Sequence, residues 1–471
     1  GLYATCSLLA VWSDGVFAAG CTALRIRGTT IQLSRPCCLE VSRSGSVSVA
    51  AIEALSVLWR RSDGDSGECA VSAEAVQELS LGPVDIPNPD HLVVKPDATG
   101  EEEAGPDTAA GAIGARWSAE CPGRINDLHV ASLPEGDRVL AACEGGALVS
   151  LEADGAPDWT YETGSPVNTV HSGTLRGGEP TRIVLGCEDE YVRVLDASSR
   201  EEIWRYRPEY GNQYWAYWSW YDSSIKRVWV EDLDGDGDGE VIVTPGNMRM
   251  HLVNAGGNER WEYRTDHGTF LTYETCDLDG DGMVEIVGGN DILSSASGCR
   301  VIGVDGQQKH MLPNAGWTSQ VKDVLIADLD GDGKLEVACA VSRQENLRVH
   351  SYDEKARRWG HCLGEVPAGL ALLKGRDGQV LFAATEGATA IGFGTAGEPL
   401  WRADVSPGAS HVVRMGDRAA VVCFDGRVLL VSGDGETSEI GSVPVDVTAT
   451  AYTEGRLLLG GEDGTISAFE V

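Results

Sequence analysis

Short apolar runs separated by turns rich in Gly, Asp and Asn repeat from about residue 116 to the end of the chain. Each repeat contains strand-like runs in which apolar residues dominate, and the last run of most repeats carries a Trp. Compare VLAACEGGALVSLEADGAPDWTYE, IVLGCEDEYVRVLDASSREEIWRYR and VIVTPGNMRMHLVNAGGNERWEYR. The Trp residues at this place are Trp159, Trp204, Trp261, Trp359 and Trp401. An indole repeated once per unit is typical of packing between units, so we interpret these residues as core.

Eight first strands can be placed along the array, starting near residues 124, 167, 227, 271, 320, 368, 410 and 446. The last unit, TATAYTEGRLLLGGEDGTISAFEV, has no Trp strand, and ARWSAE with Trp117 precedes the first unit. Pairing the two ends of the array in one unit is how a β-propeller closes its ring. The pattern predicts an all-β fold with an eight-bladed propeller, or a seven-bladed one if two weak units merge.

Three of the repeats contain the same acidic pattern, in the link between the first and second strands. Carboxylates at positions 1, 3, 5 and 9, with a main-chain carbonyl at position 7, are ligands suited to Ca²⁺, and the glycines permit the tight turn. The predicted ligands are Asp232, Asp234, Asp236, Asp238 and Glu240, then Asp277, Asp279, Asp281, Met283 and Glu285, then Asp328, Asp330, Asp332, Lys334 and Glu336. Three solvated acidic turns are the alternative. We expect up to three Ca²⁺ ions with a structural role.

The region before the repeats differs in composition. Residues 1–82 contain strand-like runs with Gly, Asp and Ser turns, and residues 83–115 are rich in Pro, Gly, Ala and acidic residues. We predict a small β-sandwich-like region at 1–82, an exposed linker at 83–115 and the calcium-binding propeller at 116–471.

The VRVLDASSREEIW cadence resembles the repeats of quinoprotein-type (PQQ-like) propellers, and the acidic loops are similar to FG-GAP or VCBS repeats. Residues 1–82 loosely resemble the C-terminal β-sandwich of heparinase-type polysaccharide lyases. Rhamnogalacturonan lyases and ulvan lyases also use propellers. The resemblance implies a propeller fold and a link to polysaccharide degradation.

The formal charge of −35 argues against nucleic acid as a partner, because neutralising phosphates requires a basic face. No apolar run is long enough for a membrane-spanning helix. Because the chain begins at Gly1, we expect a processed form or an additional N-terminal domain. The 13 cysteines form no CxxC pair and are interpreted as mostly buried and free. The calcium loops favour an extracellular or periplasmic protein.

Two groups of residues outside the acidic loops have side chains suited to a ligand. The link before the third repeat, YGNQYWAYWSWY, is rich in aromatic residues, which can stack on sugar rings or pack against the propeller. With residues of the two following links, the predicted ligand-binding set is Tyr214, Trp215, Tyr217, Trp218, Trp220, His267, Trp317 and Lys322.

The second group lies at the start of the first strands. Alignment of the repeats places Asn126, Asn168, Lys226, Leu271 and Lys322 at one level, and Asp127, Thr169, Arg227, Thr272 and Asp323 at the next; His129 and His171 are likewise equivalent positions. A lyase needs a cation to neutralise the uronate, together with a base and an acid. His171, Tyr273, Arg227 and Lys226 are the candidate catalytic residues, with structural ion pairs as the alternative.

Three functions remain open from the sequence. The favoured one is a carbohydrate- or protein-binding module of a polysaccharide-degrading protein. The others are a polysaccharide lyase with its active site at the mouth of the propeller channel, and a purely structural or adhesive module. Whether the chain is an enzyme is left undecided.

Overall fold

The structure is a computed structural model of the whole chain, in which the chain divides into two compact units, Gly1–Thr108 and Ala109–Val471. It describes residues 114–471 apart from 209–222, 265–268, 291–297, 314–319, 343–345 and 454, and, within residues 1–113, the backbone of nine strands. All regular structure in these described residues is β-strand. In this part of the chain no helix has the length and apolar character needed to cross a membrane.

The strands of the N-terminal unit belong to one hydrogen-bonded sheet, in which β4 pairs with β3, β5 and β6. The strands are β1 (Leu2–Thr5), β2 (Leu8–Trp12), β3 (Gly15–Ile26), β4 (Thr29–Ser42), β5 (Ser46–Ala50), β6 (Leu55–Arg60), β7 (Ser66–Val71), β8 (Gln77–Ser80) and β9 (Val93–Lys95). The side chains that would form a sandwich core lie outside the described residues, so the sandwich-like arrangement stays a prediction.

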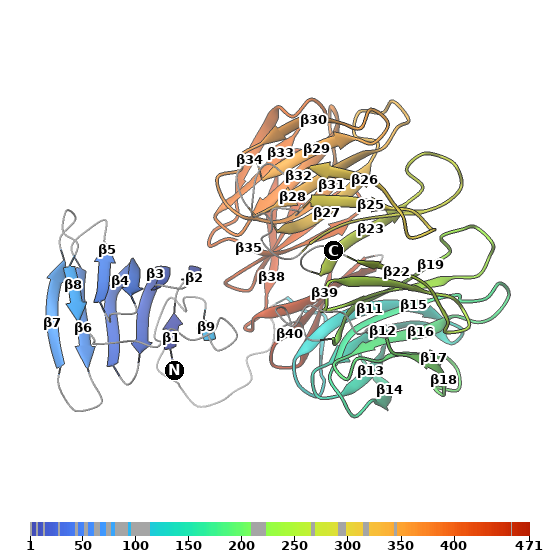
Figure 1. Cartoon of the computed structure of the whole chain (residues 1–471), viewed down its shortest axis with the longest axis horizontal. Coiled ribbons are helices and arrows are strands. Elements are labelled where there is room, and N and C mark those ends of the chain that lie inside the picture. Colours follow the sequence, from blue (N-terminus) through green and yellow to red (C-terminus); the bar gives the residue numbers. More distant parts are fainter. Residues whose placement is uncertain are drawn as a thin grey trace. The chain divides into compact units, whose positions relative to one another are not determined.

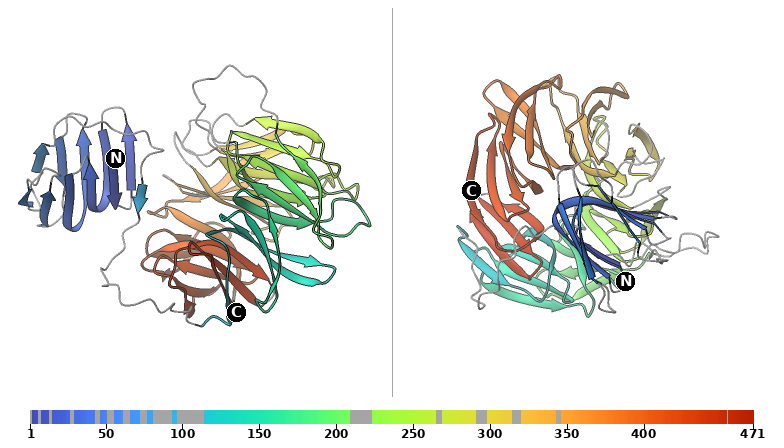
Figure 2. Two further views of the ribbon diagram at one scale, coloured as in Figure 1. Left: turned by 90° about the horizontal axis from the view of Figure 1, so that it is seen from below. Right: turned by 90° about the vertical axis from the view of Figure 1, so that its left-hand side faces the viewer.

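The second unit consists of eight four-stranded antiparallel sheets arranged as the blades of a propeller (Figure 1 and Figure 2). Blades 1 to 4 are β11 (Ile125–Leu133), β12 (Gly136–Cys143), β13 (Ala147–Glu152) and β14 (Pro157–Glu162); β15 (Val167–Gly173), β16 (Arg182–Cys187), β17 (Val192–Asp196) and β18 (Glu202–Tyr206); β19 (Ile225–Glu231), β20 (Glu240–Pro245), β21 (Arg249–Val253) and β22 (Glu259–Arg264); and β23 (Phe270–Cys276), β24 (Glu285–Asn290), β25 (Gly298–Ile302) and β26 (Gln308–Pro313).

Blades 5 to 7 follow the same order of strands, and blade 8 combines the two ends of the array. They are β27 (Val321–Ala327), β28 (Glu336–Val341), β29 (Leu347–Ser351) and β30 (Ala356–His361); β31 (Pro367–Gly375), β32 (Gly378–Thr385), β33 (Thr389–Phe393) and β34 (Pro399–Asp404); β35 (Ala409–Met415), β36 (Arg418–Cys423), β37 (Arg427–Ser432) and β38 (Thr437–Ser442); and β39 (Val447–Thr453), β40 (Arg456–Gly461), β41 (Thr465–Glu470) and β10 (Trp117–Glu120).

Ring closure occurs as predicted, because β10 pairs antiparallel with β41 and brings Trp117 opposite Ala468. The eight-bladed prediction is therefore confirmed. Closure completes the eighth sheet with strands from both ends of the array, so the first and last blades are held together by β-sheet hydrogen bonds.

The burial of each strand follows its place in the blade. Second strands are buried along most of their length, because both of their faces meet neighbouring blades, and this accounts for apolar runs such as β20 and β28. Fourth strands lie at the rim, so β22 and β34 alternate between half-buried and exposed residues. The core is thus divided among the blade interfaces, with no single central core.

The repeated Trp residues contact the blade that follows their own. The Trp204 indole N–H donates to the Ala255 carbonyl at 3.1 Å, and the Trp401 N–H donates to the Gly433 carbonyl at 2.8 Å, in each case in the following blade. The rings lie so close to Gly257 and Gly435, both at positive φ, that a Cβ there would collide with them. The indoles are packing elements between blades, as their periodicity predicts.

Candidate functional site

The three acidic loops link the first and second strands of blades 3, 4 and 5. They follow β19, β23 and β27 and end where β20, β24 and β28 begin, at Glu240, Glu285 and Glu336. Links between first and second strands lie on the propeller face opposite the links between blades, because the strands of each blade alternate in direction. The three loops therefore share one face of three consecutive blades.

Each loop folds around its first Asp. In blade 3 the Asp232 carboxylate accepts the backbone N–H groups of Gly235 at 2.8 Å and Gly237 at 3.0 Å, and both glycines have positive φ. Asp277 and Asp328 accept the equivalent pairs of N–H groups. The loop sequence supplies its own hydrogen-bond acceptors at the place where a long hairpin link would leave amides without strand partners.

The Glu at the ninth position anchors the other end of each loop. Glu240, Glu285 and Glu336 are buried and accept the backbone N–H of the Leu that follows the first Asp, at 3.1, 2.9 and 3.0 Å. One carboxylate oxygen thereby binds the loop backbone, and the other faces a basic side chain of the fourth strand.

Carboxylates of each loop converge on one point. Ligand oxygens lie within 4.8 Å of one another in three groups, which are Asp232, Asp234 and Glu240; Asp277, Asp279 and Glu285; and Asp328, Asp330 and Asp332. A set of carboxylate oxygens around a Gly-containing turn fits a hard divalent cation such as Ca²⁺. Asp236 and Asp281 lie outside these groups, while Glu336 accepts the Leu329 N–H at the edge of the third.

The seventh positions were expected to contribute only their main-chain carbonyls. Their side chains point elsewhere than to the carboxylate groups. Asp238 accepts the Gly177 N–H of blade 2 at 3.0 Å, Lys334 pairs with Asp353 at 2.7 Å, and the Met283 side chain is exposed.

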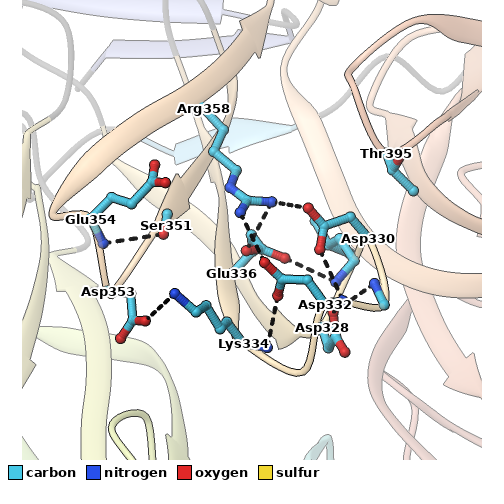
Figure 3. A network of polar contacts seen from close by, with 12 residues as sticks. Asp328, Asp330, Asp332, Lys334, Glu336, Ser351, Asp353, Glu354, Arg358 and Thr395 are labelled. Atoms are coloured by element: carbon cyan, nitrogen blue, oxygen red, sulfur yellow. Dashed lines mark hydrogen bonds and ion pairs between the residues drawn. The ribbon is translucent and has the colours of Figure 1, made fainter.

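A basic side chain from the fourth strand reaches each acidic group. Arg260 lies 2.7 Å from both Asp234 and Glu240, and Lys309 pairs with Glu285, Asp279 and Asp281. In blade 5 Arg358 pairs with Asp330, Glu336 and Asp332 (Figure 3). Hydrogen bonds from these guanidinium groups hold the pKa of Asp234 and of Asp330 below their usual range.

A β-bulge aims these three side chains. In the pairing of the third and fourth strands, the register shifts so that Arg260, Lys309 and Arg358 are the extra residues. At the same bulge, blades 1, 2 and 6 carry Asp158, Ile203 and Leu400. A cation at the bulge therefore accompanies an acidic loop. In the sequence, this basic residue directly precedes Trp261, His310 or Trp359. The acidic motif alone does not predict it.

The second candidate site is the central channel, where two cavities of about 440 and 450 Å³ share Arg227, Trp229 and Thr450. The first strands line both cavities. Each first strand has a bulge at its start, as at Val167/Thr169 and Ile225/Arg227, so the predicted levels of equivalent residues are present in the fold. The four candidate catalytic residues His171, Tyr273, Arg227 and Lys226 all line one or both cavities.

Three rings from consecutive blades pack against one another at tilted angles along the channel wall. His129 and His171 have centroids 4.5 Å apart, and His171 lies 4.2 Å from Trp229. His171 Nδ1 accepts the Val230 backbone N–H at 3.2 Å, and its burial lowers the pKa to about 3. Burial lowers the pKa of His129 to about 4. Both imidazoles are neutral near pH 7, and the lone pair of His171 Nδ1 is engaged by the backbone.

The opposite part of the channel is charged and internally paired. Arg414 of blade 7 donates to Glu274 of blade 4, and to Asp323 of blade 5 at 2.9 Å. The Arg227 guanidinium lies 4.9 Å from the centroid of the Tyr273 ring, and burial raises the pKa of Tyr273 to about 12. These contacts connect blades across the ring and fill part of the channel.

The two predicted channel lysines form ion pairs with neighbouring blades. Lys226 lies 3.9 Å from Glu188 of blade 2, and Lys322 lies 3.1 Å from Glu386 of blade 6. The remaining residues of the predicted ligand-binding set lie outside the described residues, namely Tyr214, Trp215, Tyr217, Trp218, Trp220, His267 and Trp317. The side chain of Leu271 also lies outside them.

Comparison with known proteins identifies the fold but assigns no family. No family model matches the chain, and no curated protein matches it. Among solved structures, it is similar to BamB from Moraxella catarrhalis, at 15% identity and a TM-score of 0.56, over 76% of this chain and 100% of BamB. It is also similar to Sqt1 of Saccharomyces cerevisiae, at 12% identity and a TM-score of 0.59 over 76% and 99%, and to the designed protein Ika8, at 12% and 0.56 over 75% and 98%. These likenesses establish a β-propeller and no narrower family.

Proposed function

We propose that the chain is a non-catalytic binding propeller of the extracellular or periplasmic space, in which up to three Ca²⁺ ions hold blades 3 to 5. Its ligand is a polysaccharide or a protein. The observation that carries the proposal is the convergence of carboxylates in three consecutive blades around loops of the same geometry. Asp232, Asp277 and Asp328, with their neighbours in each group, would hold the ions.

Calcium would act on this fold by neutralising charge. Each loop gathers three carboxylates and has one basic side chain beside it, so a net negative charge remains in each cluster. A divalent cation offsets that charge and fixes the link between the first and second strands. Each loop ends at a buried Glu that begins the second strand. An ion that fixes the loop would therefore also stabilise the start of that strand.

The channel supports binding better than catalysis. A general base for β-elimination needs a free lone pair and a pKa near the working pH. His171 directs Nδ1 at a backbone N–H and has a depressed pKa, and Tyr273 has a raised one. A polysaccharide lyase remains the second candidate because Arg227, Lys226, His171 and Tyr273 do meet at the channel.

The ligand surface we propose is the face that carries the links between blades. The aromatic link before blade 3 joins Tyr206 at the end of β18 to Ile225 at the start of β19, and both strand ends lie on that face. Rings such as Trp215 and Trp218 are suited to stacking on sugars.

The test combines affinity electrophoresis with an ultraviolet assay, on uronate-containing and neutral polysaccharides with Ca²⁺ present. Retarded migration without new absorbance is expected, and it should disappear in the Trp215→Ala, Trp218→Ala double variant. The control is Phe424→Ala, which removes an exposed ring from a turn of blade 7 on the same face. Rising absorbance would replace the proposal with the lyase. If no glycan retards migration, polysaccharide binding is ruled out, and protein recognition or a scaffold role remains as the function.

A further inference from the structure

Two buried thiols meet across the interface between blades 4 and 5. The sulfur atoms of Cys299, on β25, and Cys339, on β28, lie 2.8 Å apart. Both side chains are fully buried and belong to one apolar cluster with Val287, Val301 and Val337. The S–S distance in a disulfide is about 2.05 Å, so a small movement of the two side chains would bring the sulfurs to bonding distance.

Buried Cys143 also meets a thiol, that of the half-buried Cys121, whereas the thiol of Cys423 binds a backbone carbonyl. Cys423, which is buried at the end of β36, donates its thiol to the Val405 carbonyl at 3.5 Å. Cys339 instead donates to another thiol, that of Cys299 in the preceding blade. Packing alone requires a small apolar side chain at each place, and it does not require two sulfurs in contact.

We propose that Cys299 and Cys339 form a disulfide that covalently joins blade 4 to blade 5. The oxidant is a low-molecular-weight disulfide such as oxidised glutathione. One protein thiolate attacks it, forms a mixed disulfide and releases one glutathione thiol. The second protein thiolate then attacks the mixed disulfide and releases the other, so that two protein thiols are oxidised and one glutathione disulfide is reduced to two thiols.

The bond forms before the two blades have packed together. The hydrogen bond with Cys339 and burial raise the pKa of the Cys299 thiol in the folded state, and the attacking species is the thiolate. Burial also excludes the oxidant from the finished interface. Once formed, the disulfide links residues 40 positions apart and lowers the conformational entropy of the unfolded chain.

The experiment refolds the reduced, denatured chain with and without glutathione disulfide, in EDTA so that calcium does not contribute. After denaturation and alkylation of free thiols, peptide mapping by mass spectrometry should find Cys299 linked to Cys339. The melting temperature of the oxidised protein should exceed that of the reduced protein by roughly 5 °C.

Matched variants separate the bond from general packing. Cys339→Ala should abolish the difference between oxidised and reduced protein, whereas Cys423→Ala, which also truncates a buried cysteine, should retain it. If Cys339→Ala does not fold, the peptide map of the unaltered chain still decides. Alkylation of both Cys299 and Cys339 after oxidative refolding, or a link from either to a different cysteine, would overturn the proposal.

Discussion

The connection between the first and second strands differs between two sets of blades, namely blades 3 to 5 and blades 1, 6 and 7. In blades 1, 6 and 7 the first and second strands are joined by tight turns, at residues 134–135, 376–377 and 416–417. In blades 3 to 5 a longer acidic loop stands at that place, and the Asp and Glu side chains replace the missing strand hydrogen bonds. The long link is possible because its carboxylates satisfy its own backbone.

The difference extends to the rim strand. Where the turn is tight, as in blade 6, the bulge residue Leu400 is half exposed and apolar. Where the loop is acidic, the bulge residue is a cation that contacts the carboxylates. The acidic loop and the basic bulge residue therefore occur together. In blades 3 to 5 the bulge residue offsets part of the negative charge of the loop.

The largest effect should come from a feature that both kinds of blade share. Trp261→Ala in blade 3 and Trp401→Ala in blade 6 each remove an indole that packs against a Gly of the next blade and donates to its backbone. Each should lower the free energy of unfolding by about 3 kcal/mol, with or without calcium. Denaturant unfolding measures this, and a loss that differs strongly between the two blades would show that the scaffold is not common to them.

The next effect should appear only in the acidic blades. Replacing Asp232 and Asp277 with Asn removes a ligand from two loops, so the rise in melting temperature on adding Ca²⁺ should fall to that of the remaining loop. At a free concentration ten times the dissociation constant, each site contributes about 1.4 kcal/mol. Asp417→Asn, in the tight turn of blade 7, is the control and should leave the response intact. An unchanged response in the double variant would remove the metal assignment.

A smaller effect should come from the bulge cation. Arg358→Met removes a positive charge that contacts Asp330 and Glu336, so the metal-free protein should melt at a slightly lower temperature. Calcium should bind the blade 5 loop several-fold more tightly, because no side chain competes for the same oxygens. Calcium titration of Arg358→Met beside Ile203→Met, which alters the bulge of blade 2, measures this. Weaker binding by Arg358→Met would mean that the arginine supports the ion.

A further effect depends on pH and concerns the channel. The folded pKa of His171, about 3, is depressed below the unfolded value, so its contribution to stability is present above about pH 6.5 and is lost as pH falls toward 3. His171→Asn keeps an acceptor for the Val230 N–H and removes the titration. Between pH 6.5 and 4 in EDTA, its melting temperature should fall less than that of the unaltered chain. Parallel curves would show that His171 does not titrate on unfolding.

The sequence was informative wherever a pattern repeated. Blade number, ring closure by Trp117, and the place of the acidic loops followed from periodicity, because each blade solves the same packing problem. It was less informative where contacts join different repeats. The bulge that aims Arg260 depends on strand register, and the pairing of Arg414 with Glu274 depends on the diameter of the ring. The contact between Cys299 and Cys339 likewise depends on how two blades face each other.

The most direct test of the account is the number of Ca²⁺ ions bound per chain, measured by equilibrium titration of chelator-treated protein at constant ionic strength. The account predicts saturable binding that approaches three ions, with one lost for each of Asp232→Asn, Asp277→Asn and Asp328→Asn. Absence of saturable binding, or binding that survives all three substitutions together, would contradict it.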